Sequence, residues 1–291
     1  MDAIQICPMS SSTNTPTSSG GGISAATTLD NGFYSLAGEK MLPKLKNPVY
    51  YVYDGSFEGL LTAVYEAYYQ SMKPDLIVSQ ANYQEDLLVK KIVIQTDCLK
   101  ADKVYDAIIK KISYEALQKV FCVFLSELPE SATMIYEYLR LGWMIGEKVD
   151  FCLSEQKVLN VHTVFKKVSS EKHRMLGFIR FRKIKGNIYY APIEPDYNII
   201  GLLAPHFARR FNDQYFVIHD VRRNTAVVYN RSEWIISEFT ANQVIAFDKD
   251  EQNVQNLWKQ FFDSITIKDK INPRLQKQFM PKRYWKYLIE K

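Results

Sequence analysis

The sequence predicts an α+β protein in which helices pack around short antiparallel strands and hairpins. Three observations predict this class. Residues 49–53 are β-branched and aromatic, as is typical of a strand. Residues 57–170 contain several segments whose apolar residues recur at helical spacing. Further along the chain, two stretches of alternating polarity turn at Gly or Asn, as β-hairpins do.

The chain divides into a tail and a body. Residues 1–47 are predicted to be a disordered tail, because the stretch SSSTNTPTSSGGGISAATT is Ser, Thr and Gly with almost nothing to bury. Residues 48–291 are predicted to be a single α+β domain, in which residues 99–170 are a candidate helical insertion.

The body begins with a strand over residues 49–53 and a helix after it. Asp54 and Gly55 form the turn between them, and Ser56 is placed to cap the helix. The apolar positions of the helix recur at i, i+3, i+4, i+7, i+8 and i+11, namely Phe57, Leu60, Leu61, Val64, Tyr65 and Tyr68.

The middle of the chain is predicted to be one strand followed by four helices. The strand lies in LLVKKIVIQTD. Three helices follow in KADKVYDAIIKKI, SYEALQKVFCVFLSEL and ESATMIYEYLRLGWMIG, and a long fourth helix covers residues 154–170.

Two hairpins around a helix follow. MLGFIRFRKIKGNIYYAPIEP predicts a hairpin that turns at residues 185–187, and its alternation puts Phe178, Arg180 and Arg182 on one face. DYNIIGLLAPHFARRF returns to helical spacing, and QYFVIHDVRRNTAVVYN predicts a hairpin that turns near residues 223–224.

The C-terminal part is predicted to be helical again, over residues 254–262 and from residue 273 onward. In the last helix, Trp285 and Leu288 are spaced to dock on the core. Lys282 and Arg283 then face outward.

Several classes of protein and site are not expected. No apolar run approaches the roughly 20 residues that span a bilayer, and we see no secretory signal. The four cysteines, at positions 7, 98, 122 and 152, lack CxxC spacing and suit buried, reduced thiols of a cytoplasmic protein. No metal site, membrane contact or cofactor is therefore predicted. The common catalytic motifs, such as GxSxG, the P-loop and HExxH, are absent.

Positive charge is concentrated in two segments. Residues 166–231 carry thirteen Lys or Arg against five Asp or Glu, and residues 268–291 carry eight against two. Because the whole chain carries only +5, the remainder is acidic. This asymmetry favours a surface that faces a polyanion, and two solvated faces without a ligand are the alternative.

The pattern HxxRR occurs twice within the first basic segment, at residues 206–210 and 219–223. Arginine matches phosphate geometry and stacks on bases, so we expect the two copies to converge as a phosphate clamp. Ion pairs with local carboxylates, from Asp213, Asp220 and Glu194, are the alternative. The candidate nucleic-acid-binding residues are Arg180, Arg182, His206, Arg209, Arg210, His219, Arg222, Arg223, Lys282 and Arg283.

Catalytic candidates are few. Asp54 and Glu58 in YDGSFEG could form an acidic active-site turn, but helix capping explains both residues. His219 and Asp220 could be a general base and its orienting carboxylate, but adjacent strand residues point to opposite faces.

Long segments of the chain resemble a known bacterial family. They are YYVYDGSFEGLLTAVYEAY, GFIRFRKIKGNIYYAPIEPDYNIIGLLAPHFARRF, FVIHDVRR and NPRLQKQFMPKRYWKYL. They resemble a family of DNA metabolism or DNA repair proteins that is built on a domain of unknown function. The resemblance covers roughly residues 48–291.

The resemblance implies a genetic neighbour, a radical-SAM protein of DNA repair or modification. Some relatives are fused to a uracil-DNA glycosylase-like domain, and we expect no such fusion here. The chain has no CxxxCxxC motif, so iron–sulfur chemistry would belong to the partner. The family supplies no established catalytic residues to carry over.

Taken together, the sequence predicts a cytoplasmic accessory protein of DNA repair or DNA modification. It would bind DNA through its basic half and act with the radical-SAM partner. Two alternatives stay open. The first is an enzyme that acts on DNA or a nucleotide, with His219, Asp220 or Glu58 in the chemistry. The second is a non-catalytic protein–protein adaptor.

The composition of residues 1–47 generates a first prediction. Ordering each residue costs about 1–2 kcal/mol, which this segment has too little apolar surface to offset. Deleting residues 1–47 should therefore leave the melting temperature within a few degrees of the full-length value in a calorimetric scan. A large fall in melting temperature would show that the segment docks on the body.

Overall fold

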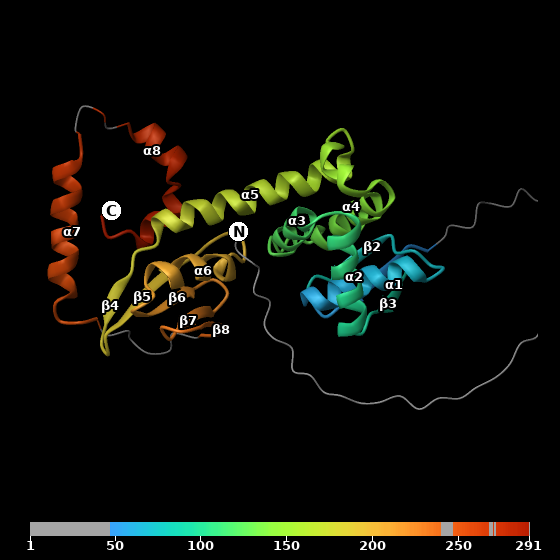
Figure 1. The fold of residues 1–291 in the computed structure, drawn as a ribbon, viewed down its shortest axis with the longest axis horizontal. Coiled ribbons are helices and arrows are strands. Elements are labelled where there is room, and N and C mark those ends of the chain that lie inside the picture. Colours follow the sequence, from blue (N-terminus) through green and yellow to red (C-terminus); the bar gives the residue numbers. More distant parts are fainter. Residues whose placement is uncertain (1–46, 240–246, 268–269, 271, 291) are drawn as a thin grey trace, which may run out of the picture. The chain divides into compact units, whose positions relative to one another are not determined.

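A computed structural model of the chain describes residues 47–239, 247–267, 270 and 272–290. The predicted N-terminal tail, apart from its last residue, lies outside the described residues. Within them the α+β class is confirmed, since helices and strands alternate around two separate sheets (Figure 1).

The first sheet has three strands in the order β2-β1-β3. They are β1 (Val49–Tyr53), β2 (Leu76–Ser79) and β3 (Lys90–Val93), and β1 pairs in parallel with both neighbours. Helix α1 (Phe57–Tyr69) carries the chain back between β1 and β2, so β2 enters the sheet in the same direction as β1. The expectation of antiparallel strands is therefore wrong for this sheet.

The turn between β1 and α1 is held as the sequence predicts. The hydroxyl of Ser56 accepts a hydrogen bond from the amide of Gly59 at 2.9 Å and so caps α1. Asp54 Oδ1 accepts from the Ser56 amide at 2.8 Å, and Asp54 Oδ2 accepts from Thr96 Oγ1 at 2.7 Å. Hydrogen bonds from the turn and from Thr96, which follows β3, therefore account for Asp54.

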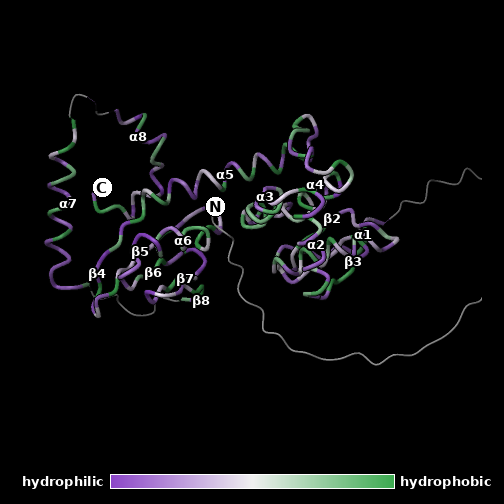
Figure 2. The backbone as a smooth tube through the Cα atoms, in the orientation of Figure 1, coloured by the Kyte–Doolittle hydropathy of each residue, from purple (hydrophilic) through white to green (hydrophobic). Residues whose placement is uncertain are grey.

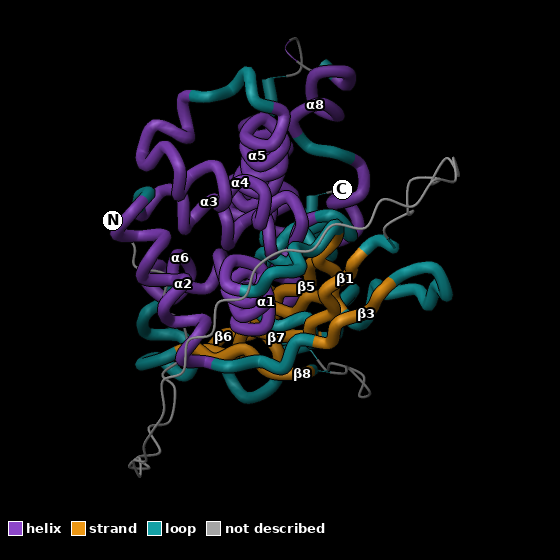
Figure 3. The backbone as a smooth tube through the Cα atoms, turned by 90° about the vertical axis from the view of Figure 1, so that its right-hand side faces the viewer, coloured by secondary structure: helices purple, strands orange, loops and turns teal. Residues whose placement is uncertain are grey.

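The chain between β3 and the second sheet is helical. Its helices are α2 (Cys98–Lys111), α3 (Tyr114–Phe124), α4 (Ser131–Ile145), the short 3₁₀ turn Gly146–Phe151 and α5 (Gln156–Phe178) (Figure 3). All four predicted helices are confirmed.

Helix α5 is longer than the sequence predicts, because it continues past residue 170 to Phe178. Its hydrophobic and hydrophilic positions alternate along its length (Figure 2). The buried positions face α3, α4 and α6, namely Val158, Val161, Val164, Val168, Glu171 and Met175. Phe178 is helical, so the predicted alternation of Phe178, Arg180 and Arg182 along a strand is wrong.

The second sheet has five strands in the order β4-β5-β6-β7-β8. The strands are β4 (Arg182–Ile184), β5 (Ile188–Ile193), β6 (Tyr215–Asp220), β7 (Thr225–Tyr229) and β8 (Trp234–Glu238). Both predicted hairpins are confirmed, and their turns use the positive φ angles of Gly186, Asn187 and Asn224.

Helix α6 (Ile200–Arg210) joins β5 to β6, and these two strands are parallel. The C-terminal elements are α7 (Glu251–Ile265), α8 (Pro273–Phe279) and the 3₁₀ turn Lys282–Tyr287. Leu288 is buried as predicted, but Tyr284 rather than Trp285 is the fully buried aromatic side chain there.

No helix among the described residues is long and apolar enough to cross a membrane. The three cysteines in the described part of the chain are unpaired. Cys98 is exposed rather than buried, because it opens α2 directly after the cap residue Asp97.

Alanine substitutions at two helical glycines should change the stability of the protein in opposite directions. A Cβ on Gly59 would lie 2.1 Å from Asp54 Oδ1, whereas a Cβ on Gly177 meets nothing within 4 Å. Gly59→Ala should therefore destabilise the protein by about 1–3 kcal/mol through overpacking. Gly177→Ala should stabilise it by about 0.5–1 kcal/mol through the lower backbone entropy of the unfolded chain. Urea unfolding measures both, and stabilisation by both would show that Asp54 is free to move away.

Candidate nucleic-acid interface

The two HxxRR copies lie at opposite ends of strand β6. Ile188 pairs with Tyr215 and Ile193 pairs with Asp220, so α6 must return along the sheet between β5 and β6. Arg210 therefore ends α6 near the start of β6, while the second copy continues past its end. A strand of six residues separates them by about 20 Å. The predicted convergence of the two copies is wrong, because the short turn leads into a full strand.

The first copy lies at the end of α6. Arg209 and Arg210 are exposed and His206 is half-buried. Burial and the neighbouring guanidiniums of Arg210 and Arg209 lower the pKa of His206. This end of α6 is thus positively charged through its arginines, with a neutral imidazole beside them.

Arg210 shares a groove of about 520 Å³ with Arg180. The Arg180 guanidinium bonds both carboxylate oxygens of Glu290, at 2.6 and 3.2 Å. Burial would raise the pKa of Glu290, but the hydrogen bonds from Arg180 and Trp258 lower it overall. The positive charge of Arg180 is therefore neutralised inside the protein.

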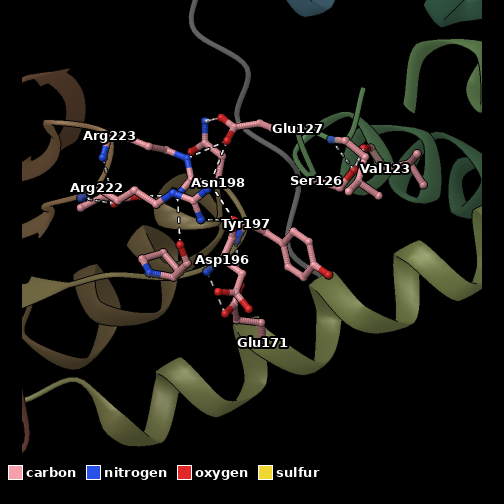
Figure 4. Close-up of polar contacts among 12 residues, drawn as sticks. Val123, Ser126, Glu127, Glu171, Asp196, Tyr197, Asn198, Arg222 and Arg223 are labelled. Atoms are coloured by element: carbon pink, nitrogen blue, oxygen red, sulfur yellow. Dashed lines mark hydrogen bonds and ion pairs between the residues drawn. The ribbon is translucent and has the colours of Figure 1, made fainter. Parts of the chain in front are cut away.

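The second copy contains an internal ion-pair network (Figure 4). Arg223 Nη1 lies 2.9 Å from Asp220 Oδ2, and Arg223 Nη2 lies 2.8 Å from Glu127 Oε2. The same guanidinium donates to the carbonyls of Pro195 and Asp196. Only 11% of the Arg223 side chain is exposed. The ion-pair alternative thus describes Arg223, although Glu127 was not among the carboxylates considered from the sequence.

Arg222 is exposed, and within the described residues its guanidinium donates to the carbonyl of Asp196, at 3.3 Å. His219 is 2% exposed, and its Nδ1 lies 2.7 Å from the hydroxyl of Tyr190. Asp220 instead bonds the amides of Arg222 and Arg223. His219 and Asp220 therefore have separate partners, as adjacent residues on a strand should, and they form no dyad.

The remaining candidates, Arg182, Lys282 and Arg283, also divide into side chains with partners inside the protein and exposed side chains. Arg283 Nη2 lies 2.8 Å from Asp196 Oδ2 and 3.3 Å from Glu171 Oε1. Arg182 Nη2 donates to the carbonyl of Tyr287 at 3.3 Å. Lys282 is exposed. Arg283 is exposed, as predicted, with 45% of its side chain accessible, but its guanidinium is also held by the two carboxylates.

A larger groove, of about 1110 Å³, runs along α5. Its basic side chains are Lys166, Arg174, His162 and His173. Its hydroxyls are Thr163, Ser169 and Ser170, and its aromatic side chains are Phe165, Phe178 and, from α8, Phe279. Among the residues that the structure describes, no Asp or Glu lines this groove.

Sequence reasoning missed most of this groove. Its residues on α5 follow helical spacing from Leu159 through Thr163, Lys166 and Ser170 to Gly177. That stripe spans about 27 Å of helix. The signal was present in the basic density from residue 166 onward, but it was hidden because the helix was expected to end at residue 170.

In the described part of the chain, no three His, Cys, Asp or Glu side chains group in a way that could hold a metal ion. His162 has one carboxylate partner, since its Nε2 lies 2.9 Å from Asp150 Oδ1. The chemistry of the groove is therefore that of its cationic side chains, hydroxyls and aromatic rings, which line it.

A family model described as a domain of unknown function (DUF4130) matches residues 129–290. The match covers more than half of the 291 residues, and the chain belongs to this family. It includes α4 to α8 and the five-stranded sheet, and it begins after the parallel sheet. No curated protein gives a significant match to the chain.

The two neighbouring arginines of the β6–β7 turn should differ in their effect on stability. Arg223→Ala leaves Asp220 fully buried without its cation, which should cost about 3–5 kcal/mol. Arg222→Ala removes an exposed side chain and should change the free energy of unfolding by less than about 1 kcal/mol. Urea denaturation compares the two variants. Small, equal changes would show that the Arg223 network contributes little to folding.

Proposed function

We propose that the protein binds nucleic acid along the α5 groove and acts in DNA repair or DNA modification as a cytoplasmic accessory to a radical-SAM protein. The observation that carries this proposal is the lining of the groove, where four basic side chains lie among hydroxyls and aromatic rings without a carboxylate. The resemblance to DNA metabolism proteins supplies the biological context.

The chemistry of the groove fits a polyanion. Lys166 and Arg174 neutralise phosphates and release their counterions. The hydroxyls of Thr163, Ser169 and Ser170 donate hydrogen bonds to phosphate oxygens without adding charge. These groups follow one helix face, so they can track a strand rather than a single phosphate.

The aromatic rings favour single-stranded nucleic acid. Phe165, Phe178 and Phe279 line the groove, and unpaired bases stack on such rings irrespective of sequence. In a duplex the bases already stack on one another, so the rings would contribute less. Single-stranded DNA is therefore the proposed ligand.

The proposed role is binding rather than catalysis. The titratable groups in the groove are His162, Lys166, His173 and Arg174, and His162 is already paired with Asp150. Arg210, exposed at the end of α6, extends the positive surface of the basic segment. The radical-SAM partner would supply the reaction, and this chain would hold the strand.

The test is a salt titration of oligonucleotide binding by fluorescence anisotropy. Each phosphate contact contributes roughly 0.7 to the slope of log K against log salt for a single strand. Lys166→Ala combined with Arg174→Ala should therefore lower the slope by roughly 1.4. Because the rings rather than these charges favour the single strand, the same variant should keep its preference for single strand over duplex.

The matched control is Lys110→Ala combined with Arg231→Ala, which removes the same charges outside the groove. This control should keep the wild-type slope. An equal loss of slope in both double variants would indicate a general charge effect and would refute binding in the α5 groove. Absence of any binding by the wild-type protein at low salt would overturn the proposal.

A further inference from the structure

A second cavity, of about 460 Å³, lies at the carboxyl ends of β1 and β2 in the parallel sheet. Gly55 and Ser79 line it from the two strand ends, and Ser131 and Ala132 line it from the first turn of α4. Strands β2 and β3 flank β1 on opposite sides. In open parallel sheets, ligands bind outside the carboxyl ends of the strands, and this cavity lies at that edge, on the β1–β2 side.

The first turn of α4 is left without a side-chain cap. Glu130 occupies the N-cap position and makes no capping hydrogen bond. Thr133, two residues into the helix, is committed to β2 instead, because its hydroxyl accepts from the Ile77 amide at 2.9 Å and donates to the Ile77 carbonyl at 3.1 Å. The helix of 15 residues therefore presents its positive end at the cavity.

Ser131 supplies an independent sign of a ligand. The residue is only 6% exposed, and its hydroxyl makes no hydrogen bond within the described part of the chain. Because Ser131 lines the cavity, its hydroxyl is available to a molecule inside it.

The charge around the cavity does not exclude an anion. Glu127 is the carboxylate in its lining, and Arg223 neutralises it at 2.8 Å. The Asn198 amide donates to the other Glu127 oxygen at 3.1 Å. Glu127 is thus engaged on the side of the second sheet, and Ser79 and the start of α4 with Ser131 line the cavity.

We propose that this cavity binds the phosphate monoester of a nucleotide, with the phosphate at the start of α4 beside Ser131 and Ser79. Helix N-termini attract phosphate through the helix dipole and the first-turn amides, and of these the Ser131 amide already donates to the Leu128 carbonyl at 3.0 Å. The volume is much larger than a phosphate requires and falls within the usual range of small-molecule sites, so the sugar and base occupy the remainder. This site is separate from the α5 groove and does not depend on it.

Isothermal titration calorimetry on the full chain tests the site with three probes: inorganic phosphate, deoxyadenosine 5′-monophosphate and deoxyadenosine. The monophosphate should bind more tightly than phosphate, and the nucleoside should not bind. Ser131→Asp places a carboxylate where the phosphate would sit, and a carboxylate there suits a helix N-terminus. It should weaken the monophosphate roughly tenfold or more, and Ser131→Ala should weaken it less.

Ser232→Asp is the matched control, since it adds the same charge in an exposed turn outside the cavity. It should bind the monophosphate like the wild type. Equal weakening by Ser131→Asp and Ser232→Asp, binding of the nucleoside as tight as that of the monophosphate, or no binding of either phosphate probe would each overturn the proposal.

The source of the phosphate is resolved by oligonucleotides with and without a 5′-phosphate. A preference for the phosphorylated strand that Ser131→Asp abolishes identifies a strand end. Binding of the free monophosphate without that preference identifies a small molecule. The combined Lys166→Ala and Arg174→Ala variant should still bind the monophosphate, so failure of the α5 groove and failure of this cavity are distinguishable.

Discussion

The buried carboxylate of Glu171, in the middle of α5, is the interaction on which the surrounding arrangement depends. Its two oxygens accept hydrogen bonds from the amides of Asp196 and Tyr197, at 3.0 and 2.9 Å, and from the Tyr284 hydroxyl at 2.5 Å. Burial and the bond to Glu171 raise the pKa of Tyr284, so its hydroxyl stays protonated as the donor. Glu171 thus holds two segments against α5, namely the loop after β5 and the 3₁₀ turn Lys282–Tyr287. This turn follows α8, which supplies Phe279 to the α5 groove.

The loop fixed by Glu171 in turn supplies hydrogen-bond acceptors for Arg223. The carbonyls of Pro195 and Asp196 accept from its guanidinium, which leaves the remaining donors for Asp220 and Glu127. Glu127 lies in the connection between α3 and α4 at a positive φ of 54°. The network therefore holds the connection that leads into α4. Because the network rests on the loop that Glu171 fixes, the cavity at the first turn of α4 depends on a carboxylate buried in α5.

The elements with strong periodicity could be predicted, and the contacts that assemble them could not. Helix α1, its Ser56 cap and both hairpin turns follow from local spacing and turn chemistry. Strand β2 was not predicted, because LIVS is a short run without alternating polarity. The partners of Arg223 show the limit most clearly. Asp220 is three residues away and could be proposed, whereas Glu127 is 96 residues away and could not.

The match to the domain of unknown function separates the two proposed sites. Every residue used for the α5 groove, from Leu159 to Phe279, lies inside the matched range 129–290. The cavity at α4 takes Ser131 from that range, but Gly55 and Ser79 come from the parallel sheet that precedes it. The groove is therefore complete within the shared domain, whereas the cavity exists only where the parallel sheet packs against α4. A nucleotide site there would be a property of this combination of sheet and domain, and strand binding would be a property of the domain itself.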